Sequence, residues 1–281
     1  MIRFAFVWGI LLLLPAACGK PDVFHVESFA QSEGSDIRLN EPLLFRFSHE
    51  IDRSSIGART ARIVNERGEE ARGRWVVLGR ELRFLPRLPL EPDCEDAGLS
   101  PGQRYTVHLT GYPAYCAVLS IKGTRLVNTS AYAFRTVSWQ DDRLAMFEDP
   151  EPEAGLKLIE VGGIPYSKLG SEGVFVEAGT ALELVFSEPL FPHAIHCSRA
   201  KILMIYRQGG TAVDQAQLAL TSRILDKGPR GAVVVIEPEG GFQKATRYNL
   251  FLEMLDYTDF GGRPLETHGH ITIDCSGGST P

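Results

Sequence analysis

Apolar and polar residues alternate along several short segments of this chain. Within residues 43–48, Phe45 and Phe47 fall on one side of the backbone, while Arg46 falls on the other. A period of two residues is the signal of a β-strand that buries one face. The same period occurs in residues 104–110 and 182–187, and a β-branched run of the kind buried on both sides occupies residues 233–236.

No long segment shows the period of 3.6 residues that marks an amphipathic helix. Many short strands joined by turns are typical of sandwiches and barrels, so the pattern predicts an all-β fold. Turn signals rich in glycine or proline separate the strands at residues 66–68, 100–102, 208–210, 227–229 and 261–262.

The two halves of the chain repeat each other. Phe-Ser at 47–48 recurs at 186–187, which is 139 positions later. An Arg-Tyr segment at 104–109 has its counterpart at 247–252, at an offset of 143. Three matched segments in one order and at nearly one offset indicate a duplicated unit of domain size. The third matched pair is residues 131–136 and 270–274.

Between the repeats, residues 148–153 are acidic and rich in proline. Because proline lacks an amide hydrogen and like charges repel, we expect an extended, semi-rigid linker there. The predicted organisation is a signal segment at 1–17, a first β-sandwich domain at 18–138, the linker at 139–155, a second β-sandwich domain at 156–276 and a flexible tail at 277–281.

Residues 1–17 have the pattern of an export signal, with Arg3 followed by an apolar run. A membrane-spanning helix needs about 20 apolar residues. Lys20 and Asp22 end this run too early, so a cleaved signal is the better interpretation.

The sequence Pro-Ala-Ala-Cys at 15–18 resembles the lipobox of bacterial lipoproteins, which implies cleavage before Cys18 and acylation of that residue. A lipobox usually has leucine where this chain has Pro15, and the alternative is an ordinary signal with Cys18 free or paired. In Gram-negative lipoproteins, a residue such as Gly19 after the cysteine implies sorting to the outer membrane. We therefore expect a lipid-anchored envelope protein, with membrane lipid as a partner through Cys18.

Composition excludes some classes of function. The chain has 29 Lys and Arg against 35 Asp and Glu, for a net charge of −6, so we expect no nucleic-acid partner. It is 44% hydrophobic and 23% charged, which excludes global disorder.

The five cysteines fit export to an oxidising compartment. If Cys18 carries lipid, four remain, and four cysteines allow three pairings. Pairing within each half needs the fewest assumptions, so we predict the disulfides Cys94–Cys116 and Cys197–Cys275. A predicted strand separates the first two cysteines, so the preceding loop must run alongside it to close the bond.

Each half resembles a bacterial Ig-like domain of the SbsA (Big_5) type. That pattern contains F-S-x-x-apolar, F-x-P, L-x-P-G-x-x-Y, a D-x-x-G loop and a closing F-x-T. The first half departs from it at the D-x-x-G loop, where a longer stretch contains Cys116. It matches at residues 47–48, 84–86, 99–105 and 134–136.

The second half departs at the turn, residues 242–246, and lacks the closing F-x-T. The resemblance implies two tandem Ig-like β-sandwich domains that serve as spacers or adhesive modules on the cell envelope, with an unknown envelope protein or polysaccharide as partner. The second half matches at residues 186–190, 236–238, 248 and 256–261.

Catalytic motifs are missing from the sequence. It contains no G-x-S-x-G, P-loop, G-x-G-x-x-G or C-x-x-C pattern, so we expect no enzymatic activity and no cofactor. Asp256 and Asp259 are too few for a calcium cage, and the resemblance implies that the first of them, Asp256, shapes the turn by accepting backbone hydrogen bonds.

Two alternative functions stay open. A Cys197–Cys275 bond would gather His193, His196, His268 and His270, and neutral imidazoles suit zinc or copper. A carbohydrate-binding module would instead need exposed coplanar rings on one sheet face, for which Tyr112, Tyr115 and Tyr132 are the candidates.

Overall fold

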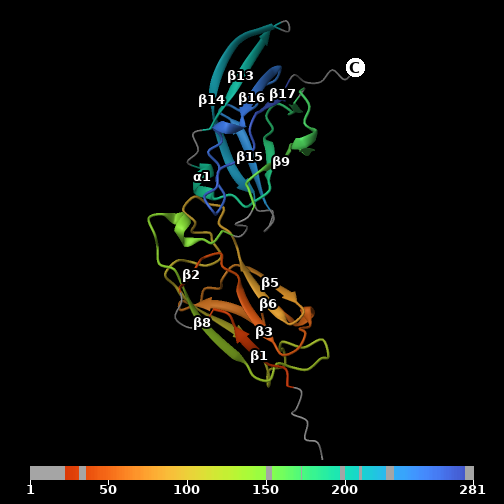
Figure 1. Ribbon diagram of the computed structural model, residues 1–281, viewed down its shortest axis with the longest axis vertical. Coiled ribbons are helices and arrows are strands. Elements are labelled where there is room, and N and C mark those ends of the chain that lie inside the picture. Colours follow the sequence, from red (N-terminus) through yellow and green to blue (C-terminus); the bar gives the residue numbers. More distant parts are fainter. Residues whose placement is uncertain are drawn as a thin grey trace, which may run out of the picture.

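The computed structural model describes residues 23–31, 36–149, 154–171, 173–196, 200–208, 211–225 and 231–275. Strands dominate these residues, and α1 (Pro192–His196) is the only α-helix among them. The predicted all-β class is therefore confirmed. Within the same residues, no helix is both long and apolar enough to cross a membrane. Figure 1 shows two β-rich bodies placed one after the other along the long axis of the molecule.

The N-terminal half contains two four-stranded sheets. The first has the order β1 (Val26–Phe29), β3 (Leu43–Phe47), β6 (Glu81–Pro86), β5 (Gly73–Leu78). The second has the order β2 (Asp36–Ile37), β8 (Ser130–Thr136), β7 (Arg104–Leu109), β4 (Ala61–Asn65). Buried side chains from both sheets form one hydrophobic cluster, so the sheets pack face to face.

In the C-terminal half, nine strands are linked in one hydrogen-bonded series. The long strand β14 pairs with β13 over residues 211–219 and with β15 over residues 220–225, so it passes from one layer to the other. The order is β10 (Ile164–Pro165), β9 (Leu158–Val161), β12 (Leu182–Phe186), β15 (Ala232–Pro238), β14 (Thr211–Leu225), β13 (Lys201–Gln208), β16 (Thr246–Phe251), β17 (His270–Asp274), β11 (Val174–Phe175).

The strand order of the first half recurs in the second. The series β1-β3-β6-β5 corresponds to β9-β12-β15-β14, and β2-β8-β7-β4 corresponds to β11-β17-β16-β13. Each half also contains one parallel pair in the equivalent place, β2 with β8 and β11 with β17. This agreement in topology matches the offsets between the repeated sequence segments. The described residues also contain four 3₁₀ turns: η1 (Arg53–Ser55), η2 (Arg143–Met146), η3 (Tyr166–Lys168) and η4 (Leu252–Met254).

The repeated Phe-Ser dipeptide fastens the start of each half. The Ser48 hydroxyl accepts a hydrogen bond from the His25 amide at 3.0 Å and donates one to the Val23 carbonyl at 3.1 Å. In the same way, the Ser187 hydroxyl accepts from the Lys157 amide at 3.0 Å and donates to the Gly155 carbonyl at 3.2 Å. Phenylalanine enters the core while serine satisfies backbone groups at the sheet edge, which explains why the two residues recur together.

The repeated tyrosine closes a turn in each half. The Tyr105 hydroxyl accepts a hydrogen bond from the Ser100 amide at 2.9 Å, and the Tyr248 hydroxyl accepts one from the Gln243 amide at 2.8 Å. Both tyrosines are buried. The second half therefore keeps this contact although its turn lacks the Pro-Gly pair of the first.

One backbone position in this turn provides a stability test. Gly102 has φ +66°, and the equivalent Ala245 has φ +60°, a left-handed conformation that disfavours a Cβ atom. The Ala245 side chain is exposed, so its removal loses no packing. We expect Ala245→Gly to raise the free energy of unfolding by about 0.5 kcal/mol and Gly102→Ala to lower it by about 1 kcal/mol. Urea denaturation measures both free energies. If the two substitutions changed the free energy of unfolding in the same direction, the left-handed backbone at this position would not be strained by a Cβ atom.

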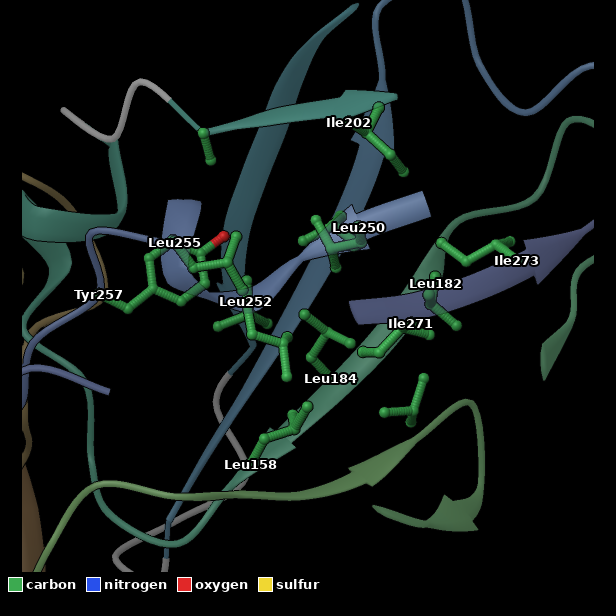
Figure 2. Packing of buried hydrophobic residues seen from close by; sticks show 14 of the residues in the cluster. Leu158, Leu182, Leu184, Ile202, Leu250, Leu252, Leu255, Tyr257, Ile271 and Ile273 are labelled. Carbon is green, nitrogen blue, oxygen red and sulfur yellow. The ribbon is translucent and has the colours of Figure 1, made fainter. Parts of the chain in front are cut away.

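The C-terminal half has its own hydrophobic core. Figure 2 shows Leu184 of β12 facing Leu250 of β16 and Ile271 of β17, with Tyr257 at one edge of the cluster. The Tyr257 hydroxyl lies 2.6 Å from the Ser222 hydroxyl, and burial raises its pKa to about 12. A phenol that is buried and hydrogen-bonded stays neutral and structural at physiological pH.

Candidate functional site: the junction between the two halves

The stretch that we expected to be an extended linker is partly folded onto the N-terminal half. Residues 143–146 form η2, and Met146 and Phe147 are buried. The Leu39 amide donates to the Met146 carbonyl at 2.9 Å. Asn40 binds the backbone of Glu148 twice, donating to its carbonyl at 2.7 Å and accepting from its amide at 2.6 Å. The chain therefore leaves the first half on a fixed path.

Three phenylalanine rings meet where the halves join. Phe147 comes from the end of the N-terminal half, while Phe191 and Phe260 come from loops of the C-terminal half. Ring centroids lie 6.0 Å apart for Phe147 and Phe191, 5.2 Å for Phe147 and Phe260, and 5.6 Å for Phe191 and Phe260. All three are buried and pack in the core cluster of the N-terminal half. The first hydrophobic core thus extends across the junction.

An arginine fixes the loop that carries Phe260. The Arg263 Nε atom donates to Asp259 Oδ2 at 2.7 Å, and an Arg263 Nη atom donates to Asp149 Oδ1 at 3.0 Å. The Asp259 side chain is 2% exposed, and the hydrogen bond to it raises the pKa of Arg263. Because Asp149 comes from the interdomain stretch, one guanidinium group ties both sides of the junction.

Asp259 also builds its own turn. Its Oδ1 atom accepts hydrogen bonds from the Gly261 and Arg263 amides, both at 2.9 Å, and Gly262 has φ +76°. This residue, rather than Asp256, shapes the D-x-x-G loop. A Cβ atom at Gly261 would lie 2.4 Å from Asp149 Oδ2, so glycine permits the close approach.

The N-terminal half contains the equivalent loop, which corrects our expectation that a longer stretch replaces it. Ser120 pairs with Ile51 as Asp259 pairs with Leu190. The Ser120 hydroxyl accepts a hydrogen bond from the Thr124 amide at 3.1 Å, and Gly123 has φ +77°. Serine in place of aspartate hid the D-x-x-G motif from sequence comparison.

An apolar cavity of about 280 Å³ lies beside the junction. Leu88 and Leu90 line it from the N-terminal half, and Leu190 and Ile224 line it from the C-terminal half. Cavities of this kind at domain interfaces are common places for small apolar ligands. Leu225 and Gly231 also line it, and residues 226–230 between them lie outside the described part of the chain.

The predicted Cys94–Cys116 disulfide is not formed. Both cysteines are free, with Cys94 buried and Cys116 exposed. Cys94 lies close enough to Arg143 of η2 for the two groups to interact electrostatically. Cys116 instead lines a groove with Arg59 at the other end of β7. Six strand residues span about 20 Å, and a disulfide allows about 7 Å between Cα atoms. The intervening strand, foreseen as an obstacle, therefore separates the pair.

Cys275 is also free in the structure. Its amide donates to the Thr246 carbonyl at 2.9 Å, at the start of β16. Ile202 pairs with Leu250 near the other end of that strand. The described residues that flank Cys197 therefore lie far along the sheet from Cys275. Cys197 and the predicted lipidation site Cys18 are outside the described residues.

The thiols give a direct prediction. Burial raises the pKa of the Cys94 and Cys275 thiols to about 11, so both stay protonated near neutral pH and are shielded from reagents. Cys116 is exposed. We expect a maleimide to modify Cys116 in the native protein within minutes and Cys94 and Cys275 only after unfolding, as read by peptide mass spectrometry. Equally fast modification of Cys94 and Cys116 in the native protein, or no modification of Cys116, would contradict this arrangement.

The histidine candidates receive no support as a metal site from the described residues. His268 and His270 are exposed; the His268 carbonyl accepts a hydrogen bond from Tyr166 and the His270 ring packs against Phe251. His193 lies beside Phe191 at the junction. Among the described residues, no group of three or more His, Cys, Asp or Glu side chains is placed to hold a metal ion. The side chain of His196 is outside the described part.

The three tyrosines do not form one platform on a sheet face. Tyr112 and Tyr115 are 62% and 92% exposed, and both lie in the loop after β7. Tyr132 is partly buried in β8, where its ring packs 5.5 Å from both Phe29 and Phe45. Burial also raises the pKa of Tyr132. The carbohydrate-binding arrangement considered above is therefore not present.

The described chain is an all-β protein of two topologically similar halves joined by a buried junction. No known protein-family model matches the sequence, and no curated protein matches it.

Three solved structures are similar at low level. Native alpha-2-macroglobulin from Escherichia coli, spanning domains MG0-NIE-MG1, has a TM-score of 0.38 and 12% identity, over 90% of this chain and 71% of that one. The N-terminal part of the bacterial S-layer protein SbsC has a TM-score of 0.28 and 12% identity, over 90% and 44%. The native conformation of E. coli alpha-2-macroglobulin in a second structure has a TM-score of 0.36 and 10% identity, over 91% of this chain and 14% of that one. Similarity of this size carries no functional argument.

Proposed function

We propose that the chain is a non-enzymatic lipoprotein of the bacterial cell envelope in which two Ig-like sandwiches form a stiff spacer. The lipobox at residues 15–18 supports the anchor, and sorting to the outer membrane agrees with Gly19. The repeated strand order supports two sandwiches of one kind. Lipid holds the N-terminal end, and the C-terminal half presents its surface to an envelope protein or polysaccharide at a distance from the membrane.

The closed junction is the observation that carries the spacer function. Domains within one chain move relative to each other by default unless their interface is hydrophobic and large enough to hold them. Bending here would expose Phe147, Phe191 and Phe260, and re-exposing one buried phenylalanine costs about 1.5–3 kcal/mol. It would also break the hydrogen bond from Arg263 to Asp149. A stiff connection of this kind suits a protein that must hold one end away from a membrane.

A distance measurement between the two ends tests the stiffness. The chain from Gly19 onward, carrying Cys197→Ser, takes one spin label at the exposed Cys116 and one at Glu239→Cys, an exposed position after β15. The buried Cys94 and Cys275 stay unlabelled. Double electron–electron resonance should give one narrow distance distribution, because the junction fixes the halves.

A matched variant controls this measurement. Adding Phe260→Ala should broaden the distribution, since it removes the ring that touches both other phenylalanines at the junction. A broad distribution in the parent protein would refute the spacer. The anchor is tested separately by mass spectrometry of the mature N-terminus from the native host, where an unmodified terminus other than Cys18 would refute lipidation.

A further inference from the structure

The end of the N-terminal half away from the junction surrounds the place where the described chain begins. The Val127 amide donates to the Phe24 carbonyl at 2.9 Å, and the Ser48 hydroxyl donates to the Val23 carbonyl at 3.1 Å. Cys18 lies five residues before Val23. Five residues span at most about 18 Å when fully extended. We call residues 111–129, with η1 and Arg59 beside them, the anchor-side face; in Figure 1 it lies near β1.

Large apolar and aromatic side chains gather on the anchor-side face. Tyr112, Tyr115, Ile121 and Val127 are 62%, 92%, 62% and 38% exposed. They are four of the eleven exposed large hydrophobic residues in the described part of the chain, and all four lie within residues 111–129. Tyrosine is favoured at membrane–water interfaces, where the ring is shielded and the hydroxyl stays wet.

The repeat shows that this position of the fold is used for docking. Ile121 follows Ser120 in the first half as Phe260 follows Asp259 in the second, and the two loops pair with equivalent residues. Phe260 is 2% exposed because it packs into the N-terminal half, whereas Ile121 is 62% exposed. An apolar side chain projects from the same loop in both halves, but in the described structure only the second is covered.

The charge of this face opposes that of the whole chain. No Asp or Glu occurs from residue 97 to residue 140, although the chain has 35 of them. Arg59 and Arg125 line an open groove together with Tyr115. Lys122 is exposed beside Ile121, and Glu50 and Asp52 lie next to this face, because their backbone groups bond to those of Ile121 and Leu119. Asp52 is occupied in capping η1, where it accepts from the Ser54 amide at 2.9 Å.

We propose that the anchor-side face rests on the headgroups of an anionic phospholipid bilayer. The basic side chains contact lipid phosphates, Tyr112 and Tyr115 lie in the interface, and Ile121 reaches the acyl boundary. Each basic residue near an anionic surface contributes about 1 kcal/mol, a weak attraction that becomes effective when a lipid already tethers the chain nearby. This inference deepens the proposed function by setting the orientation of the spacer, which then stands upright from the membrane.

The exposed Cys116 lies within this face and provides the probe. The chain from Gly19 onward, with Cys197→Ser and an N-terminal hexahistidine tag, is labelled at Cys116 with the environment-sensitive dye NBD. It is then tethered to vesicles of phosphatidylglycerol and phosphatidylethanolamine that contain nickel-chelating lipid. We expect NBD emission to rise at least threefold on tethering and to be quenched by spin-labelled lipid. A label at Glu239→Cys in a Cys116→Ser background should show neither change.

Two sets of variants separate the contributions. The double variant Tyr112→Ser, Ile121→Ser should lose most of the rise in NBD emission on tethering. The double variant Lys122→Glu, Arg125→Glu should lose most of that rise on anionic vesicles. The matched control is Phe175→Ser, another exposed aromatic residue at 57%, which should leave the signal unchanged. All these side chains are exposed, so thermal melting should remain within about 2 °C of the parent protein.

Several outcomes would overturn the proposal. Cys116 emission that is the same on the vesicles as in solution would refute contact with lipid. An equal rise in solution on adding excess unlabelled protein, without vesicles, would assign the face to a second copy of the chain. Because the histidine tag replaces the natural anchor, these results are independent of lipidation at Cys18. Failure of the anchor in the native host is therefore distinguishable from failure of this face.

Discussion

Replacing Phe260 with alanine should lower the free energy of unfolding by about 3 kcal/mol, near the lower end of the range for phenylalanine in a core. Its ring is 2% exposed and lies 5.2 Å from Phe147 and 5.6 Å from Phe191. Because this ring carries the core of the N-terminal half into a loop of the C-terminal half, we also expect thermal unfolding to change from one transition to two. Differential scanning calorimetry measures both effects.

The duplicated fold supplies the control for this prediction. Ile121 occupies the same loop position in the N-terminal half and is 62% exposed. Ile121→Ala should change the free energy of unfolding by less than about 0.5 kcal/mol and leave the shape of the transition unaltered. If the two alanine variants differed by less than about 1 kcal/mol, the phenylalanine cluster would not couple the halves.

The strands and their repetition were predictable because both are local properties of the sequence. Alternation sets the face of each strand, and the Phe-Ser and Tyr residues recur because each makes one hydrogen-bonded contact that both halves need. Ser48 and Ser187 fasten the first strand, and Tyr105 and Tyr248 close a turn. Such contacts join residues at fixed positions in the fold, so the same residue types recur in both halves at nearly one sequence offset.

The cysteine pairing was wrong for a physical reason that counting cannot reveal. Cys94 and Cys116 are close in the sequence, but β7 lies between them and pairs with β8 along its whole length. A residue that precedes a strand in the sequence and one that follows it lie near opposite ends of that strand. The sequence predicts the strand but not whether the loop before it returns alongside it, and in the structure Cys94 stays near Arg143 while Cys116 lies near Arg59.

The junction was missed because its residues have no shared pattern. Phe147 follows a short 3₁₀ turn, Phe191 precedes α1, and Phe260 lies in the D-x-x-G loop. None of them belongs to a run with the period of a strand or a long helix. The acidic run that suggested a free linker contains Asp149, which the fold uses as a partner for Arg263. A charge run is therefore ambiguous until the residues facing it are known.

Substituting Arg263 with methionine should cost about 3 kcal/mol and loosen the junction. Arg263 pairs with Asp259, whose carboxylate is 2% exposed, and breaking a buried ion pair by removing one partner costs about 3–5 kcal/mol. The backbone amides of Gly261 and residue 263 still bind Asp259 in the variant, which places the expected loss at the lower end. Urea denaturation gives the free energy, and the spin-label distances should broaden as they do for Phe260→Ala.

Two further substitutions separate buried charge from lost packing. Adding Asp259→Asn to Arg263→Met should recover about 1 kcal/mol or more, because the neutral amide removes the uncompensated charge while keeping an oxygen for the turn. Asp149→Asn alone should cost less than about 1 kcal/mol, since its side chain is partly exposed and Arg263 keeps Asp259. If Asp149→Asn matched Arg263→Met, the contact to the interdomain stretch would dominate. If the double variant recovered nothing, the arginine would act by filling space, and the junction would owe its stiffness to the three phenylalanines alone.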